Sequence, residues 1–273
     1  MKRIALALMV VLLYSCLNAQ SPVIIDHRCT YFYKIPVVWM EAAKSDLHIA
    51  YGHTSHGSQL TSGMIGIYLQ YGSSYAFDHE GPVGILDLHN YFIPYIDLGE
   101  PNFHAWADST RKYLNNPANS DVNVIIWSWC GQLSWASEED VETYLGLMNQ
   151  LELDFSDVKF VYMTGHLDGT ESSGNVHLRN EQIRAHVAAN SSRILFDFAD
   201  IERYDPNNVD YLNQGANDNC DWDGGNWATS WQGSHTLNVD WYNCSCAHSQ
   251  PLNGNLKTYA AWYLWARLAG WSG

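Results

Sequence analysis

An almost continuous apolar run lies in the middle of this chain, at residues 122–129 (VNVIIWSW). Strands that are buried on both faces have this composition, and they occur in parallel sheets covered by helices on each side. Further short apolar segments resemble strands and alternate with segments of helical spacing. The expected strands are residues 46–51, 83–88, 122–129, 158–163 and 194–198. The expected helices are residues 58–71, 102–115, 138–151, 180–190 and 258–268.

This alternation predicts an α/β fold, a three-layer α/β/α sandwich around a doubly wound parallel sheet of five strands. Ser137 is expected to cap the helix 138–151. The chain contains no internal repeat and no linker, so residues 20–273 are expected to form a single domain. The stretch 205–243, rich in Asn, Asp, Gly and Trp, is expected to be an elaborated loop of that domain, and loops of this length are usually functional.

Composition excludes some functions. The chain has 14 Lys and Arg against 29 Asp and Glu, and its net charge of −15 repels phosphate backbones, so nucleic-acid binding through a basic patch is excluded. With 47% hydrophobic and 16% charged residues, the chain is expected to build a sizeable core rather than remain disordered. Its 12 Trp and 17 Tyr are expected mainly to fill that core and its rim, although such side chains also suit stacking on sugar rings.

The N-terminus has the pattern of an export signal. A basic start, Met1-Lys2-Arg3, precedes an apolar run at 4–14 that is shorter than the roughly 20 residues of a bilayer span. We expect residues 1–19 to be a signal peptide cleaved after Ala19. The alternative is a loose lipobox ending at Cys16, which would leave a lipid-anchored cysteine. Either pattern predicts a secreted or periplasmic protein, and no later stretch has the composition of a membrane span.

Five cysteines follow this leader, and exported proteins usually pair their cysteines. We expect Cys220 to pair with Cys244 or Cys246, which closes a loop of about 25 residues. The odd number leaves at least one free thiol. Cys130 directly follows a strand that has a buried composition, so it is expected to be that thiol, and a nucleophilic role for it requires a nearby histidine.

Polar and glycine-flanked residues follow several of the expected strands and precede the last helix. In open parallel sheets, ligands bind at the carboxyl ends of the strands, so these segments predict one shared site. The segments are 52–57 (GHTSHG), 97–99 (DLG), 129–132 (WCGQ), 164–169 (TGHLDG) and 246–253 (CAHSQPLN).

The simplest chemistry for this set is nucleophilic hydrolysis. Ser55 lies between two glycines just after a strand, and such a turn can expose a nucleophilic hydroxyl. His248, just ahead of the last helix, is the expected base, and Asp240 is a candidate for its acid partner. Gly99, Gln132 and the Ser55 backbone N–H are expected to stabilise the anionic intermediate. A plainer role for Ser55 is to cap the helix that follows it. The side chains expected to line the substrate site are His53, His56, Cys130, His166 and Asp168.

The order of these segments resembles the SGNH (GDSL-type) hydrolase superfamily, with GHTSHG in place of the block that carries the nucleophilic serine. Gly99 and Gln132 stand where the family has its oxyanion glycine and asparagine. His248 and the helix after it resemble the Asp-x-x-His block, although the position three before it is Ser245. The resemblance implies a flavodoxin-like fold and a Ser-His dyad, or a triad completed by Asp240. It also implies an exported serine esterase, such as an acetyl esterase, that acts on a small ester, a carbohydrate or a polysaccharide.

Two other functions compete with the esterase. The first is a metal-dependent hydrolase, although no dense zinc motif such as HExxH occurs. Its expected ligands are His53, His56, His166, Asp168 and His248. The second is a carbohydrate-binding protein without catalytic activity, in which Trp and Tyr side chains stack on sugars.

The esterase hypothesis requires no cofactor. Residues 219–224 (NCDWDG) nevertheless resemble the start of a calcium loop, which allows a structural calcium ion near Asp221 and Asp223. The twelfth position of such a loop is Ser230 rather than an acid, so a solvated Asx-rich loop is the favoured interpretation.

Overall fold

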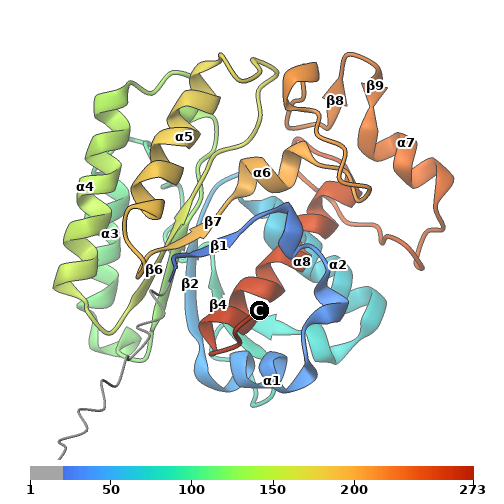
Figure 1. Cartoon of the computed structure of the whole chain (residues 1–273). Coiled ribbons are helices and arrows are strands. Elements are labelled where there is room, and N and C mark those ends of the chain that lie inside the picture. The colour runs from blue at the N-terminus through green and yellow to red at the C-terminus, as the bar shows by residue number, and fades with distance from the viewer. Residues whose placement is uncertain (1–20) are drawn as a thin grey trace, which may run out of the picture.

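A computed structural model describes residues 21–273 and shows a sheet between layers of helices (Figure 1). The expected signal peptide, residues 1–19, and Cys16 lie outside the described residues. The main sheet is entirely parallel, with strand order β1-β7-β6-β5-β2-β4-β3. Its strands are β1 (Val23–Ile25), β2 (His48–Gly52), β3 (Phe77–Asp78), β4 (Leu86–Asn90), β5 (Val124–Trp127), β6 (Lys159–Met163) and β7 (Ile194–Phe196).

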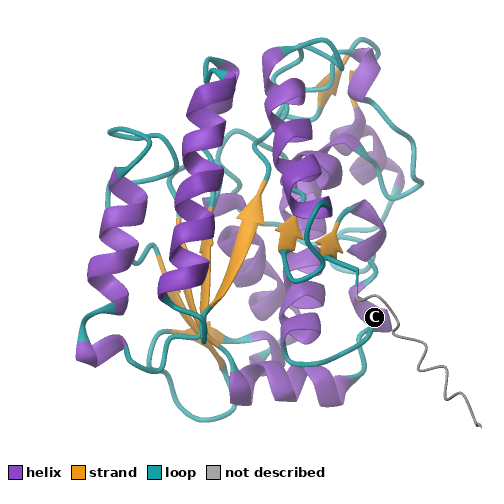
Figure 2. Cartoon of the chain, turned by 60° about the vertical axis from the view of Figure 1, so that its left-hand side comes forward, coloured by secondary structure: helices purple, strands orange, loops and turns teal. Residues whose placement is uncertain are grey.

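Helices cover both faces of this sheet (Figure 2). One face packs against α3 (Ala105–Leu114), α4 (Glu138–Asp154) and α5 (Asn175–Ala188), and the other against α1 (Val37–Asp46), α2 (Ser58–Tyr71) and α8 (Pro251–Leu268). Successive side chains of a strand point to opposite faces, so Ile49 and Tyr51 of β2 enter one apolar core while Ala50 enters the other. No helix within residues 21–273 combines the length and apolarity that crossing a membrane requires.

The prediction of a parallel sheet with helices on both faces is confirmed, but the prediction of five strands is wrong. The sheet has seven strands because β1 and β3 add short edge strands, too short to leave a pattern in the sequence. The five expected strands are β2, β4, β5, β6 and β7, and they are arranged in the order β4-β2-β5-β6-β7. In chain order this is 2-1-3-4-5, the order of a doubly wound sheet.

The helices α2 and α4 begin where the sequence predicted, whereas α8 begins at Pro251 rather than at residue 258. Three helices were not expected: α1, α6 (Phe198–Arg203) and α7 (Trp227–Ser234). The last of these lies in the stretch 205–243 that was expected to be a loop, together with a hairpin of β8 (Asp221–Trp222) and β9 (Gly225–Asn226). These elements are short, and tertiary contacts rather than local periodicity stabilise them.

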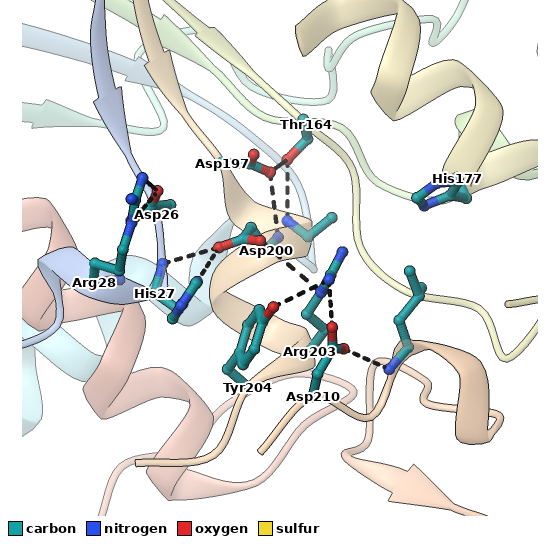
Figure 3. Close-up of polar contacts among 12 residues, drawn as sticks. Asp26, His27, Arg28, Thr164, His177, Asp197, Asp200, Arg203, Tyr204 and Asp210 are labelled. Carbon is teal, nitrogen blue, oxygen red and sulfur yellow. Dashed lines mark hydrogen bonds and ion pairs between the residues drawn. The ribbon is translucent and has the colours of Figure 1, made fainter. Parts of the chain in front are cut away.

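Helix α6 is held in place by polar contacts around its first turn (Figure 3). Asp197 caps the helix by accepting from the Asp200 N–H at 3.2 Å, and it also accepts from the Thr164 hydroxyl at 2.9 Å. Asp200 in turn accepts from the backbone N–H of His27 at 3.1 Å. These contacts join α6 to the ends of β6 and β1, and they fix the position of the helix that carries Glu202.

Ser137 caps helix α4, as the sequence predicted, and the structure shows a full capping box with Asp140. The Ser137 hydroxyl accepts from the Asp140 N–H at 3.1 Å, and the Asp140 carboxylate accepts from the Ser137 N–H at 2.8 Å. We expect Ser137→Ala to lower the free energy of unfolding by about 1 kcal/mol, measured by urea denaturation. Thr143→Ala, on the exposed side of the same helix, is the control and should cost less than about 0.5 kcal/mol. Equal effects of the two substitutions would show that the cap does not stabilise the helix.

Candidate active site

The loops that follow β2 and β5 meet at the carboxyl edge of the sheet. These strands are neighbours, with Gly52 beside Trp127. After β2 the chain builds β3 and β4 on one side, and it then returns to build β5, β6 and β7 on the other side. The boundary between β2 and β5 is therefore the topological switch point, where doubly wound folds bind ligands.

At this switch point between β2 and β5, the Cys130 thiol, the His56 imidazole and the Asp218 carboxylate form a hydrogen-bonded series. The Cys130 Sγ lies 3.1 Å from the His56 Nδ1, and the His56 Nε2 lies 3.0 Å from the Asp218 Oδ2. His56 is buried, whereas Cys130 and Asp218 are half-buried, so the series reaches the surface at both its thiol and its carboxylate. The Ser55 hydroxyl lies 3.2 Å from the same sulfur. Nucleophile, base and orienting acid are arranged as in a catalytic triad.

The surroundings of Cys130 favour its thiolate. Burial raises the pKa of this thiol, but the hydrogen bonds from His56 and Ser55 outweigh burial and lower the pKa to about 5. Burial lowers the pKa of His56, but the hydrogen bonds to Asp218 and Cys130 raise it to about 9. Near neutral pH the pair is therefore a thiolate and an imidazolium, which is the reactive form of a catalytic cysteine.

Two more histidines stack on His56. The ring of His166 lies 4.0 Å away, centroid to centroid, at an angle of 5°, and the ring of His248 lies 4.5 Å away at 15°. Two nearly parallel rings at these distances must occupy opposite faces of His56. His166 follows β6 and His248 precedes α8, so the stack brings three separate loops together.

Ser55 and His248 both lie at this site, but no hydrogen bond joins them within residues 21–273. The Ser55 hydroxyl faces Cys130, and His248 contacts the site by stacking on His56. Asp240 instead accepts from the Thr236 N–H at 2.8 Å and lines a cavity of about 230 Å³ beside Tyr204. The carboxylate that bonds the central imidazole is Asp218, which no sequence pattern indicated.

The side chain of Gln132 holds the loop after β5 rather than pointing freely into the site. Its Oε1 accepts from the Cys130 N–H at 2.9 Å, and its Nε2 donates to Asp97 at 2.8 Å. Gly99 packs against Gln132, since a Cβ at Gly99 would lie 3.0 Å from the Gln132 Cγ. This arrangement differs from the expectation that the Gln132 amide faces an oxyanion, because both ends of the amide already have partners.

His53 and Asp168 also support loops. The two ring nitrogens of His53 bond the Thr54 carbonyl at 2.9 Å and the Asn90 side chain at 2.7 Å. The Asp168 carboxylate accepts from the Thr170 N–H at 3.2 Å. Neither side chain forms a hydrogen bond with Cys130 or His56 in the described part of the chain.

A buried ion pair connects the loops beneath the stacked histidines. Lys257 of α8 and Glu202 of α6 are both fully buried, with the Nζ 2.7 Å from the Oε1. Glu202 also accepts from the N–H of Leu167, next to His166, at 2.6 Å. Lys257 donates to the side chain of Gln59.

The same Gln59 side chain donates to the carbonyl of Ala247, next to His248, at 2.6 Å. Residues adjacent to His166 and His248 are thus attached to a single buried network.

One set of side chains at the site could hold a cation. Ligand atoms of His56, Asp218 and His248 all lie within 4.8 Å of one another. Two of these three, His56 and His248, belong to the set expected for a metal-dependent hydrolase. The carboxylate of Asp221, in the expected calcium-loop segment, accepts from the side-chain amides of Asn226 at 2.9 Å and Asn219 at 3.0 Å. These bonds account for the hairpin geometry, and calcium binding there stays a prediction.

Comparison of the chain with models of known protein families, with curated proteins and with solved structures finds no significant match in any of the three.

Proposed function

We propose that this chain is a cysteine-dependent esterase in which Cys130 is the nucleophile. The observation that carries the proposal is the hydrogen-bonded series of Cys130, His56 and Asp218 at the switch point of the sheet. The sequence suggested Ser55 as the nucleophile. Within residues 21–273 its hydroxyl forms a hydrogen bond with the sulfur and with no imidazole, so we assign it the role of donating a hydrogen bond to the thiolate.

In the proposed reaction the Cys130 thiolate attacks the ester carbonyl carbon and forms a C–S bond. The tetrahedral intermediate collapses to a thioester, and the leaving alcohol takes a proton from the His56 imidazolium. Water then attacks the thioester while His56 accepts its proton, which releases the acid and restores the thiolate. Asp218 orients the imidazole and stabilises its charged form. The backbone N–H of Gly131, which has no acceptor within residues 21–273, is a candidate oxyanion donor.

The proposed substrate is an ester of a carbohydrate or polysaccharide, and we propose that the protein is exported. The resemblance to SGNH hydrolases and the leader-like N-terminus support both proposals. The 2-1-3-4-5 order of the central strands and the position of His248 just ahead of α8 support membership of that superfamily. The proposed nucleophile departs from the SGNH pattern, in which the serine after the first strand attacks.

The pH dependence of thiol alkylation tests the reactive pair. Because the pKa of Cys130 lies at about 5, its reaction with iodoacetamide should accelerate as the pH rises through about 5 and stay nearly level up to about 9. An ordinary thiol would accelerate only near pH 8.5. The site of labelling is identified by mass spectrometry, and the rate is followed under pseudo-first-order conditions.

His56→Ala is the decisive variant, because removing the imidazole should move the midpoint of Cys130 alkylation toward that of an ordinary thiol. Asp218→Asn should shift it in the same direction by less. Cys29 serves as an internal control, since burial raises the pKa of its thiol to about 11 and it should remain unlabelled. A Cys130 midpoint near pH 8.5 in the wild type would contradict the proposed ion pair.

A metal-dependent hydrolase is the second candidate, and the proximity of His56, Asp218 and His248 favours it. These side chains would hold a zinc ion, which supplies a polarised water as nucleophile. The two proposals differ in their response to chelation. The cysteine esterase should keep its activity after treatment with EDTA and lose it to iodoacetamide, whereas the metal enzyme should lose activity to EDTA and regain it with zinc.

A further inference from the structure

Two cysteines lie in contact in the loop that precedes α8, outside the proposed triad. The sulfurs of Cys244 and Cys246 are 3.4 Å apart, and both residues are partly accessible. A disulfide bond would shorten this separation to about 2.05 Å. The two thiols are therefore already neighbours and require only a small movement to bond.

The first turn of α8 leaves space for the two sulfurs, because residue 254 is a glycine. They lie over Gly254 in the first turn of α8, where a Cβ would lie 2.2 Å from the Cys246 Sγ and 3.1 Å from the Cys244 Sγ. The Cys244 thiol donates to the Pro251 carbonyl at 3.4 Å, and the Asn255 amide donates to its sulfur at 3.5 Å. The absence of a side chain at residue 254 is thus what allows the pair to pack against the helix.

The donor set around the pair does not favour a metal ion. Clusters of three or more His, Cys, Asp or Glu ligand atoms in the described chain include neither Cys244 nor Cys246. Two thiolates alone would leave a zinc ion two protein ligands short of a closed structural site. Oxidation of the two thiols to a disulfide, unlike metal binding, needs no further side chain of the protein.

The pairing of Cys220 that the sequence suggested is not formed in the structure, in which the cysteines of residues 21–273 are free. Cys220 is fully buried, and its sulfur faces the Ser249 hydroxyl at 3.6 Å. The contact between Cys244 and Cys246 therefore makes these two thiols the better-placed partners.

We propose that Cys244 and Cys246 form a reversible disulfide by exchange with a low-molecular-weight disulfide such as oxidised glutathione. One thiolate attacks the glutathione disulfide and releases one reduced glutathione. The second thiolate then attacks the protein sulfur of this mixed disulfide and releases another. Two protein thiols are oxidised to one disulfide, and one glutathione disulfide is reduced to two thiols, which retain the two protons.

This disulfide would constrain the backbone of residues 244–246, next to the candidate active site. Cys246 stands two residues before His248, which stacks on His56, and the intervening Ala247 carbonyl accepts from Gln59. The oxidation state of the pair would therefore act on the backbone that positions His248. The proposal does not depend on the function proposed for Cys130.

Mass spectrometry tests the assignment in the full chain. The protein is incubated with oxidised glutathione, and the remaining free thiols are alkylated in denaturant at acidic pH. Digestion at aromatic residues then separates Cys220 from the pair, because Trp222, Trp227, Trp231, Trp241 and Tyr242 lie between them. We expect the peptide with Cys244 and Cys246 to be unlabelled, lighter than the dithiol peptide by two hydrogen atoms, and labelled at both positions after reduction.

Three variants sharpen the result. Cys244→Ser should abolish the internal disulfide, whereas Cys220→Ser should keep it, and Cys130→Ala should keep it whether or not Cys130 is catalytic. Complete labelling of both cysteines after oxidation of the wild type would overturn the proposal. So would a peptide that joins Cys220 to either of them.

Discussion

Cys130→Ala is expected to reduce the hydrolysis of an aryl acetate by at least about 10³-fold, because loss of a nucleophile from a triad removes the covalent route. The sulfur is the nucleophilic atom of the series and is partly exposed, whereas the imidazole that bonds it belongs to the buried His56. The measurement is kcat/KM for the purified variant, after subtraction of the uncatalysed rate. Circular dichroism and the thermal midpoint should match those of the wild type.

Ser55→Ala is the matched comparison, because it removes a hydroxyl 3.2 Å from the same sulfur. Loss of one hydrogen bond to a charged group should cost about tenfold in kcat/KM. The two variants separate the two candidate nucleophiles. An inactive Ser55→Ala variant beside an active Cys130→Ala variant would refute the thiol mechanism and restore the serine mechanism suggested by the sequence.

Lys257→Met is expected to lower the free energy of unfolding by about 3–5 kcal/mol, because it leaves the carboxylate of Glu202 buried without its partner. Both side chains are fully inaccessible and lie 2.7 Å apart, so water cannot replace the lost interaction. The ammonium group also lies 3.6 Å from the centre of the Phe198 ring, and that contact is lost as well. Urea denaturation measures the change.

The double variant Lys257→Met/Glu202→Gln should recover much of this loss, because it removes the uncompensated charge. Arg111→Met is the surface control: its ion pair with Asp154, at 2.6 Å, is partly exposed and should contribute about 0–1 kcal/mol. If Lys257→Met costs no more than Arg111→Met, the buried pair does not hold the loops together. In that case the stacked histidines must be positioned by other contacts.

Sequence patterns predicted which loops meet at this edge of the sheet, but not the hydrogen bonds among His56, Cys130 and Asp218. The segments after β2, β5 and β6 were expected to meet, because the carboxyl ends of parallel strands share one edge of a sheet. Ser55, His56, Cys130, His166 and His248 do lie together there. Asp218 was missed because it lies in an irregular stretch with many Asn and Asp residues, where no spacing distinguishes one carboxylate from another.

Local patterns were sufficient to predict the layers of this protein, because strands buried on two faces need continuous apolar runs and amphipathic helices have a local periodicity. The pairing of side chains at the sheet edge depends instead on the three-dimensional fold. His56 precedes Cys130 by 74 residues and Asp218 by 162, so their meeting depends on strand order and on the path of the loop before β8. Residue spacing along the chain does not reveal contacts between residues so far apart in sequence. The sequence therefore indicated Ser55, whereas the contacts in the structure favour the neighbouring Cys130 as the proposed nucleophile.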